Sequence, residues 1–206
     1  MAEEKSVVPL NFKIFGLYDM EGIVVNDEGL KSVINLNPKL ALKSHGRNVQ
    51  KFGQAKVNVV ERLINKLAVA GHRGKKHRII LGDSTGKYSK NAKIVLEALK
   101  MVESRTKKNP VEVLVRAVEN AAPRDETTMI EYGGARYPQA VDVSPMRRIS
   151  IALKHIIHGS SDKAFGKKKN ISQALADEIV SASERNQDSF AIKKRVEAER
   201  QADSAR

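Results

Sequence analysis

Residues 132–148 read Tyr-Gly-Gly-Ala-Arg-Tyr-Pro-Gln-Ala-Val-Asp-Val-Ser-Pro-Met-Arg-Arg, and they are the most informative part of the sequence. The residues just before it, 127–132, are rich in β-branched side chains, which favours a strand. Gly133 and Gly134 can adopt the positive φ that a tight hairpin turn requires. The chain is therefore expected to reverse direction at these two glycines.

A second strand is expected over residues 137–143. Pro138 has no backbone N–H to donate to a neighbouring strand, so it indicates an edge position rather than the middle of a sheet. The two strands together predict a β-hairpin arm over residues 124–143 that protrudes from the rest of the protein.

A helix with two different faces follows the arm. Ser144 is a suitable N-cap residue, and the fixed φ of Pro145 suits the first helical position. At 100° per residue, one arc of this helix is apolar and carries Met146, Ile149, Leu153, Ile156 and Ile157. The opposite arc carries Arg147, Arg148, Lys154, His155 and His158. We expect the apolar arc to pack on the core and the cationic arc to face a polyanion.

The charge of the whole chain indicates the same kind of partner. Its 206 residues include 37 Lys and Arg against 24 Asp and Glu, which gives a net charge of +13 and a pI near 9.9. The excess is concentrated in residues 43–78, with ten basic residues against one acid, and in residues 144–170, with seven against one. Concentrated positive charge of this kind is typical of nucleic-acid-binding proteins.

Composition also narrows the class of protein. The chain has no cysteine, no apolar run of about 18 residues and no signal-like leader, so we expect a soluble intracellular protein with no membrane partner. Only five Phe, four Tyr and no Trp are present. Recognition of phosphates and shape in a folded nucleic acid is therefore favoured over stacking on single-stranded bases.

The rest of the chain is mainly helical in pattern. Helical periodicity or helix-start signals recur in five further segments, near residues 57–68, 92–102, 110–121, 171–182 and 189–206. The first has an apolar stripe of Val57, Val60, Ile64, Leu67 and Ala68, with Arg62 and Lys66 one turn apart on the other side. In the third, Asn109 is the expected N-cap and Pro110 takes the first helical position, and the residues expected to be buried are Val113, Leu114, Ala117, Val118 and Ala121. In the fourth, the residues expected to be buried are Ile171, Leu175, Ile179 and Ala182. The predicted fold is mainly α: a single helical domain of about six helices with a protruding β-hairpin arm. We divide the chain into an N-terminal extension, residues 1–42, packed on a helical body, residues 43–206.

Signals for catalysis are weak. Residues 82–87 read Gly-Asp-Ser-Thr-Gly-Lys, but a P-loop needs one more residue between the glycines and a hydroxyl residue where Tyr88 stands. His155 and His158 lie three residues apart, but no third histidine lies one turn away and Lys154 repels a cation, so they are better read as part of the basic face. No catalytic residue, metal site or cofactor is predicted.

Six short motifs follow one another in a characteristic order. They are Ser44-His45-Gly46-Arg47, Val60-Glu61-Arg62-Leu63, Asn109-Pro110-Val111-Glu112-Val113-Leu114-Val115, Ala122-Pro123-Arg124, Gln139-Ala140-Val141-Asp142-Val143-Ser144-Pro145-Met146-Arg147-Arg148 and Leu175-Ala176-Asp177-Glu178-Ile179. With these motifs the chain closely resembles the universal small-subunit ribosomal protein seven family, in its archaeal/eukaryotic type.

The resemblance implies a cytoplasmic structural protein of the small ribosomal subunit and not an enzyme. A member of this family binds the 3′ major domain of small-subunit rRNA and nucleates assembly of the subunit head. Its hairpin lies near the exit-site tRNA and the mRNA path, among ribosomal proteins of the head and platform that include small-subunit ribosomal protein eleven.

The family's functional positions can be carried over to this sequence. The tip of the arm, near tRNA and mRNA, is implied to be Gly133, Gly134, Ala135, Arg136 and Tyr137. The implied rRNA-binding residues are Lys43, His45, Arg47, Lys51, Lys56, Arg62, Arg124, Arg147, Arg148 and Lys154. Charge in two further basic loops adds Lys75, Lys76, Arg78, Lys167, Lys168 and Lys169.

The basic segments alone also permit a free architectural or regulatory nucleic-acid-binding protein. Against this alternative, the sequence has no helix-turn-helix pattern and no zinc-ligand spacing, and it carries several cationic segments rather than one reading element.

Overall fold

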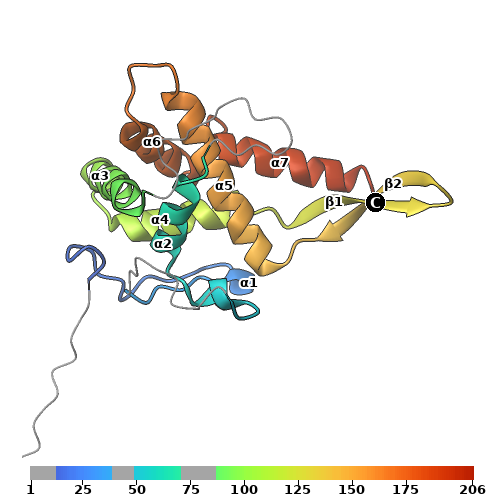
Figure 1. Cartoon of the computed structure of the whole chain (residues 1–206), viewed down its shortest axis with the longest axis horizontal. Coiled ribbons are helices and arrows are strands. Elements are labelled where there is room, and N and C mark those ends of the chain that lie inside the picture. Colours follow the sequence, from blue (N-terminus) through green and yellow to red (C-terminus); the bar gives the residue numbers. More distant parts are fainter. Residues whose placement is uncertain (1–12, 39–48, 71–86) are drawn as a thin grey trace, which may run out of the picture.

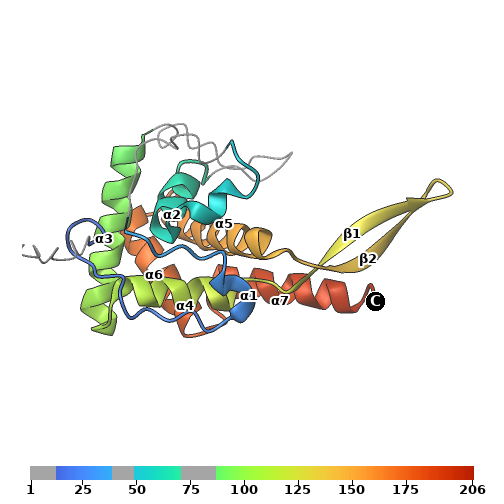
Figure 2. The same cartoon turned by 90° about the horizontal axis from the view of Figure 1, so that it is seen from below.

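The computed structural model describes residues 13–38, 49–70 and 87–206. In these ranges helices form the body, and one two-stranded hairpin projects from it (Figures 1 and 2). The elements are α1 (Glu28–Lys31), the 3₁₀ helix η1 (Gly53–Lys56), α2 (Val59–Leu67), α3 (Tyr88–Thr106), α4 (Pro110–Ala121), β1 (Asp125–Tyr132), β2 (Ala135–Asp142), α5 (Pro145–Ala164), α6 (Ile171–Ser183) and α7 (Phe190–Asp203). The predicted mainly helical fold with a hairpin arm is confirmed, and the single-turn α1 is additional to the predicted helices.

Helix α6 lies at the centre of the body, where it packs against α3, α4 and α5. Its Leu175 and Ile179 are fully buried, as are Ile149 and Leu153 of α5. These are the positions that the helical periodicity marked as apolar, so the predicted packing faces of α5 and α6 are confirmed.

Helix α4 begins as its sequence predicts. The Asn109 side chain accepts a hydrogen bond of 3.0 Å from the backbone N–H of Val111, and Pro110 occupies the first helical position. This cap satisfies one of the N–H groups that every helix start leaves without an intrahelical partner. The predicted stripe of α4 is buried throughout: Val113, Leu114, Ala117, Val118 and Ala121.

The N-terminal segment, residues 13–38, packs on the same core. Ile14 and Leu30 are fully buried in it. Asn35 accepts a backbone hydrogen bond of 3.1 Å from Val59 at the start of α2. The boundary that we placed after residue 42 lies outside the described residues.

The arm is a regular antiparallel hairpin. Residues pair from Asp125 opposite Asp142 to Tyr132 opposite Ala135, and two residues close the turn. Gly133 and Gly134 have φ values of 59° and 82°, as a two-residue hairpin turn with two positive φ angles requires. The predicted turn is therefore confirmed.

Helix α7 runs along the body to the root of the arm (Figures 1 and 2). There Arg206 forms an ion pair of 2.8 Å with Asp125 of β1. The backbone N–H of Ala140 donates to the carbonyl of Ala205 at 3.4 Å. Both strands of the arm are therefore tied to the chain that follows α7.

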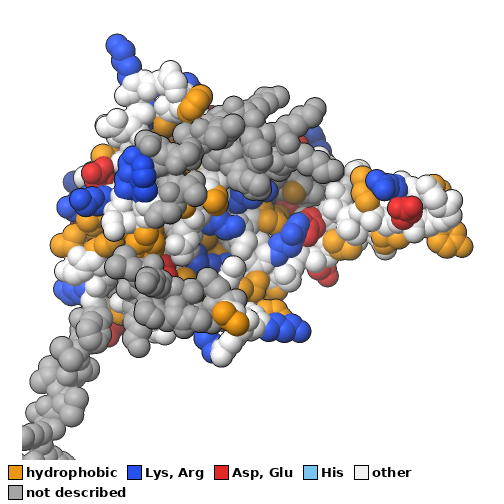
Figure 3. All heavy atoms as spheres, in the orientation of Figure 1, with side chains coloured by type: hydrophobic (Ala, Val, Ile, Leu, Met, Phe, Trp, Pro, Cys, Tyr) orange, Lys and Arg blue, Asp and Glu red, His pale blue; other side chains and the backbone are white. Residues whose placement is uncertain are grey.

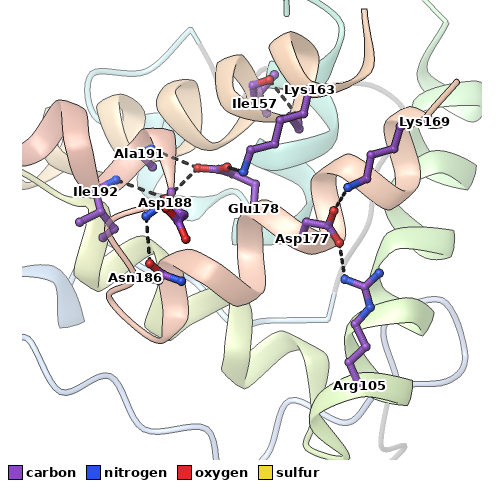
Figure 4. Close-up of polar contacts among 12 residues, drawn as sticks. Arg105, Ile157, Lys163, Lys169, Asp177, Glu178, Asn186, Asp188, Ala191 and Ile192 are labelled. Carbon is purple, nitrogen blue, oxygen red and sulfur yellow. Dashed lines mark hydrogen bonds and ion pairs between the residues drawn. The ribbon is translucent and has the colours of Figure 1, made fainter. Parts of the chain in front are cut away.

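A buried carboxylate joins α5, α6 and α7 (Figure 4). Glu178 is fully buried and accepts hydrogen bonds from Lys163 Nζ at 2.6 Å, Ser189 Oγ at 2.7 Å and the N–H of Ala191 at 3.1 Å. Gly159 of α5 lies directly over this contact: an added Cβ would come within 2.8 Å of the Glu178 carboxyl carbon and 2.7 Å of Phe190 Cβ. The start of α7 can approach α5 this closely only because residue 159 has no side chain.

Candidate nucleic-acid interface

Six of the predicted rRNA-binding residues lie outside the described ranges, namely Lys43, His45, Arg47, Lys75, Lys76 and Arg78. Residues 82–86 of the P-loop-like sequence also lie outside them. The candidate interface is therefore built from the loop before α2, helices α2 and α5, the loop after α5, and the arm.

Two cations of the predicted α5 face are exposed, Arg147 and Lys154. They lie two turns apart, on one side of the helix. Arg147 donates to both carboxylate oxygens of Glu126, at 2.5 and 2.8 Å, and these hydrogen bonds raise the pKa of its guanidinium. Arg147 thus ties α5 to the root of the arm.

Arg148 does not lie on that exposed face, and the prediction that it does is wrong. Its side chain is buried: Nε donates to the carbonyl of Pro123 at 3.1 Å and Nη2 to Asp27 Oδ2 at 2.7 Å. Partial burial raises the pKa of Asp27, but the hydrogen bond and charge of Arg148 outweigh it and the net shift is downward. Arg148 is thus a bridge between the N-terminal segment and α5.

The two histidines of α5 are also misplaced by the sequence prediction. His158 is buried, and His155 packs edge-on against Phe190 with ring centroids 6.1 Å apart. Burial lowers the pKa of His155 to about 4, and the positive charge of Lys154 adds to this effect. His155 is therefore neutral at pH 7 and adds no charge to the face.

Arg62 of α2 is a third correction. The sequence placed it opposite the buried stripe of its helix, but its side chain is only 7% exposed because α5 packs over it. Its Nη2 lies 3.4 Å from Ser150 Oγ. Burial lowers the pKa of the Arg62 guanidinium.

The loop before α2 presents two predicted cations, Lys51 and Lys56, and both are exposed. Between them stands Phe52, which is 66% exposed and has a φ of 61°. Lys51 Nζ lies 5.4 Å from the centroid of the Phe52 ring. An exposed aromatic ring therefore accompanies the cations in this loop.

The basic loop after α5 divides into two kinds of residue. Lys167 and Lys168 are exposed, whereas Lys169 forms an ion pair with Asp177, which also pairs with Arg105 of α3 (Figure 4). Only the first two lysines of the run are therefore available to a partner without breaking an internal contact.

Arg124 is exposed at the root of the arm, and all five predicted tip residues are exposed at its end. Opposed residues share a face, so Ile130 lies beside Tyr137 on one face, while Glu131 and Arg136 form an ion pair of 3.4 Å on the other. Tyr132, which the sequence analysis did not single out, is 81% exposed on the face of Tyr137.

Comparison with known proteins settles the family. The family model described as ribosomal protein S7p/S5e matches residues 33–206. The chain belongs to this family. The resemblance seen in the sequence motifs is thereby confirmed.

Three named relatives of this S7p/S5e chain are archaeal proteins, each called small ribosomal subunit protein uS7. The protein of Nanoarchaeum equitans is 46% identical over 198 residues, which covers 96% of this chain and 100% of the relative. Those of Methanococcus maripaludis and Methanococcus vannielii are 47% and 48% identical over 200 residues, covering 96% of this chain and 100% and 97% of the relatives. The relatives are named for a ribosomal subunit and not for a reaction, so the expectation of a non-enzymatic protein is confirmed.

Sequence reasoning on this S7p/S5e chain did not place Lys66 and Phe52 among the candidate interface residues. The sequence shows that Lys66 follows Arg62 by one helical turn as a basic i, i+4 pair. It does not show that Lys154 of α5 lies near Lys66. Phe52 gave no signal, because an isolated aromatic residue in a basic loop has no periodicity to read.

Among the described helices, none is both long enough and apolar enough to cross a membrane.

Proposed function

We propose that this protein is a structural constituent of the small ribosomal subunit in the cytoplasm. In this proposal it binds the 3′ major domain of small-subunit rRNA and nucleates assembly of the subunit head. Membership of the S7p/S5e family supports the ribosomal role, and the net charge of +13 supports an RNA partner.

One observation carries the RNA proposal furthest. Among the predicted rRNA-binding lysines that the structure describes, five are exposed and have no carboxylate within ion-pair distance: Lys51, Lys56, Lys154, Lys167 and Lys168. Other exposed cations, such as Arg105 and Arg147, already pair with an acid. The unpaired lysines are the groups that can neutralise phosphates and release bound counterions.

A binding experiment tests this proposal. The protein should prefer a transcript of the 3′ major domain over an unrelated structured RNA of equal length. Lys154→Met should reduce the slope of log affinity against log salt by roughly 0.7–0.9, the value of one phosphate contact. Lys100→Met on α3, which also removes an exposed cation, is the matched control and should leave the slope unchanged. Equal binding of both RNAs would contradict the proposal.

A second experiment separates a ribosomal constituent from a free architectural protein. In this experiment archaeal ribosomal subunits are sedimented in high salt, and we measure whether the protein sediments with them or is released. A constituent of the subunit should sediment with it, because the assembled RNA encloses several contacts at once, whereas a loosely bound cationic protein should be released.

For the arm, we propose that its tip lies near the exit-site tRNA and the mRNA path, beside small-subunit ribosomal protein eleven. The support is physical: residues 133–137 are all exposed and project beyond the helical body (Figure 2). Because these residues contribute nothing to the core, we expect them to contact a partner outside the chain.

A further inference from the structure

Two helical turns face each other between α2 and α5. On α2, Arg62 and Lys66 are one turn apart; on α5, Ser150 and Lys154 are one turn apart. Arg62 Nη2 lies 3.4 Å from Ser150 Oγ, and Lys66 is close enough to Arg62 and Lys154 to interact electrostatically with both. In Figure 3, Lys and Arg side chains gather over the middle of the face where Figure 1 shows α2 and α5.

Arg62, Lys66 and Lys154 have no acidic partner among the residues that the structure describes. Within the described part of the chain, no carboxylate lies within ion-pair distance of Arg62, Lys66 or Lys154. Arg148 is a useful comparison, because it is as buried as Arg62, at 8% against 7% exposure, yet has a carboxylate at 2.7 Å. Among the described residues, the protein therefore supplies an anion for Arg148 and none for Arg62.

Burying a charge without a partner is unfavourable, and placing two more like charges beside it adds repulsion. The pKa values reflect this: burial lowers that of Arg62, and burial together with the charges of Arg62 and Lys154 lowers that of Lys66. An arrangement of this kind is stable in a complex that brings an anion to it.

We propose that Arg62, Lys66, Ser150 and Lys154 form a preformed site for one phosphodiester group of an RNA backbone. The proposal rests on the proposed function, in which the partner is RNA. The guanidinium of Arg62 offers paired N–H donors that match two phosphate oxygens, the Ser150 hydroxyl can donate a further hydrogen bond, and the two ammonium groups add charge.

Two properties should follow from an unfilled anion site. A phosphate that enters it relieves the repulsion and so stabilises the folded protein by mass action. Replacing Arg62 by a neutral residue of similar length removes the buried charge, so the variant should be at least as stable as the wild type without RNA. The same replacement should weaken RNA binding. A purely structural arginine would show the opposite pattern.

The first experiment uses the full-length protein without RNA. Its melting temperature is measured in inorganic phosphate, in dimethyl phosphate and in sodium chloride at equal ionic strength. Both phosphates should raise the wild-type melting temperature above the value in chloride. This increment should vanish in Arg62→Met and shrink in Lys154→Met. Because the Lys154 side chain is exposed, the Lys154→Met variant should fold normally. Lys100→Met should keep the whole increment, which controls for the general stabilising effect of phosphate salts. An increment that persists in Arg62→Met and Lys154→Met overturns the proposal.

The second experiment distinguishes RNA phosphate from free phosphate. Arg62→Met should bind the 3′ major domain transcript about tenfold or more weakly, with a salt slope smaller by roughly 0.7–0.9. An unchanged slope, even with the phosphate increment lost, overturns the assignment to RNA. If instead the wild type fails to prefer this transcript at all, the proposed function fails, and the phosphate increment of the free protein still reports on the site.

Discussion

Arg148 donates a hydrogen bond of 2.7 Å to Asp27, a residue 121 positions earlier in the chain. The same guanidinium donates to the carbonyl of Pro123, between α4 and the arm. One buried side chain therefore holds the N-terminal segment, the root of the arm and α5 together.

Arg148→Met should destabilise the protein by about 2–4 kcal/mol, because Asp27 Oδ2 and the Pro123 carbonyl lose the guanidinium that donates to them. Arg147→Met is the neighbouring control. It breaks an exposed ion pair and should cost less than about 1 kcal/mol. Urea unfolding of the two variants measures the difference. Equal losses would show that Arg148 is no more structural than its neighbour.

His155 should make the protein lose stability in mild acid. Its pKa is about 4 in the folded protein and about 6.5 when unfolded, so the unfolded chain binds the extra proton first as the pH falls. Stability should therefore be full above about pH 6.5 and decline down to about pH 4, by roughly 3 kcal/mol in total. His155→Leu should lack this decline between pH 7 and pH 5 in urea unfolding. A decline of the same size in this variant would assign the effect to other groups.

Gly159→Ala should destabilise the protein even though alanine is the better helix former. The new Cβ would lie 2.7 Å from Phe190 Cβ and 2.8 Å from the Glu178 carboxyl carbon, so α7 must shift. We expect a net loss of about 1–3 kcal/mol, together with weaker hydrogen-exchange protection at the start of α7. An increase in stability of up to about 1 kcal/mol, as helix propensity alone predicts, would show that the start of α7 moves away from residue 159 at little cost.

The arm can be shortened without changing its register. Deleting the pairs Glu131–Arg136 and Tyr132–Ala135 together leaves Ile130 opposite Tyr137 across the same two glycines. Binding to the 3′ major domain and head assembly should be normal, because the basic surfaces lie elsewhere. Exit-site tRNA retention or reading-frame maintenance should change in assembled ribosomes. If assembly fails while surviving particles translate normally, the arm has a different role.

The sequence predicted well those features that depend on near neighbours. The packing stripe of α4, its Asn109 cap and the turn at Gly133 and Gly134 all follow from residues within one or two turns of each other. The family motifs, read in order, also led to the correct family.

Burial of charged side chains was not predictable in this way. Helical periodicity gives the direction of Arg148 and Arg62 around their helices, but their partners Asp27 and Ser150 are 121 and 88 residues away. Lys169 was likewise grouped with its two neighbours, although Asp177 on the next helix holds it. A cation is read as exposed until the fold shows what packs beside it.

The ties at the root of the arm have a mechanical consequence. Each strand has 8 residues, so at about 3.3 Å per residue the hairpin is a lever roughly 26 Å long. A rotation of about 10° at its base moves its far end by about 4–5 Å. This displacement is larger than the range of donor–acceptor distances over which a hydrogen bond persists. The position of the glycine turn is therefore decided at the other end of the hairpin, by the ion pair of Asp125 with Arg206 and the hydrogen bond from the N–H of Val143 to the carbonyl of Arg124.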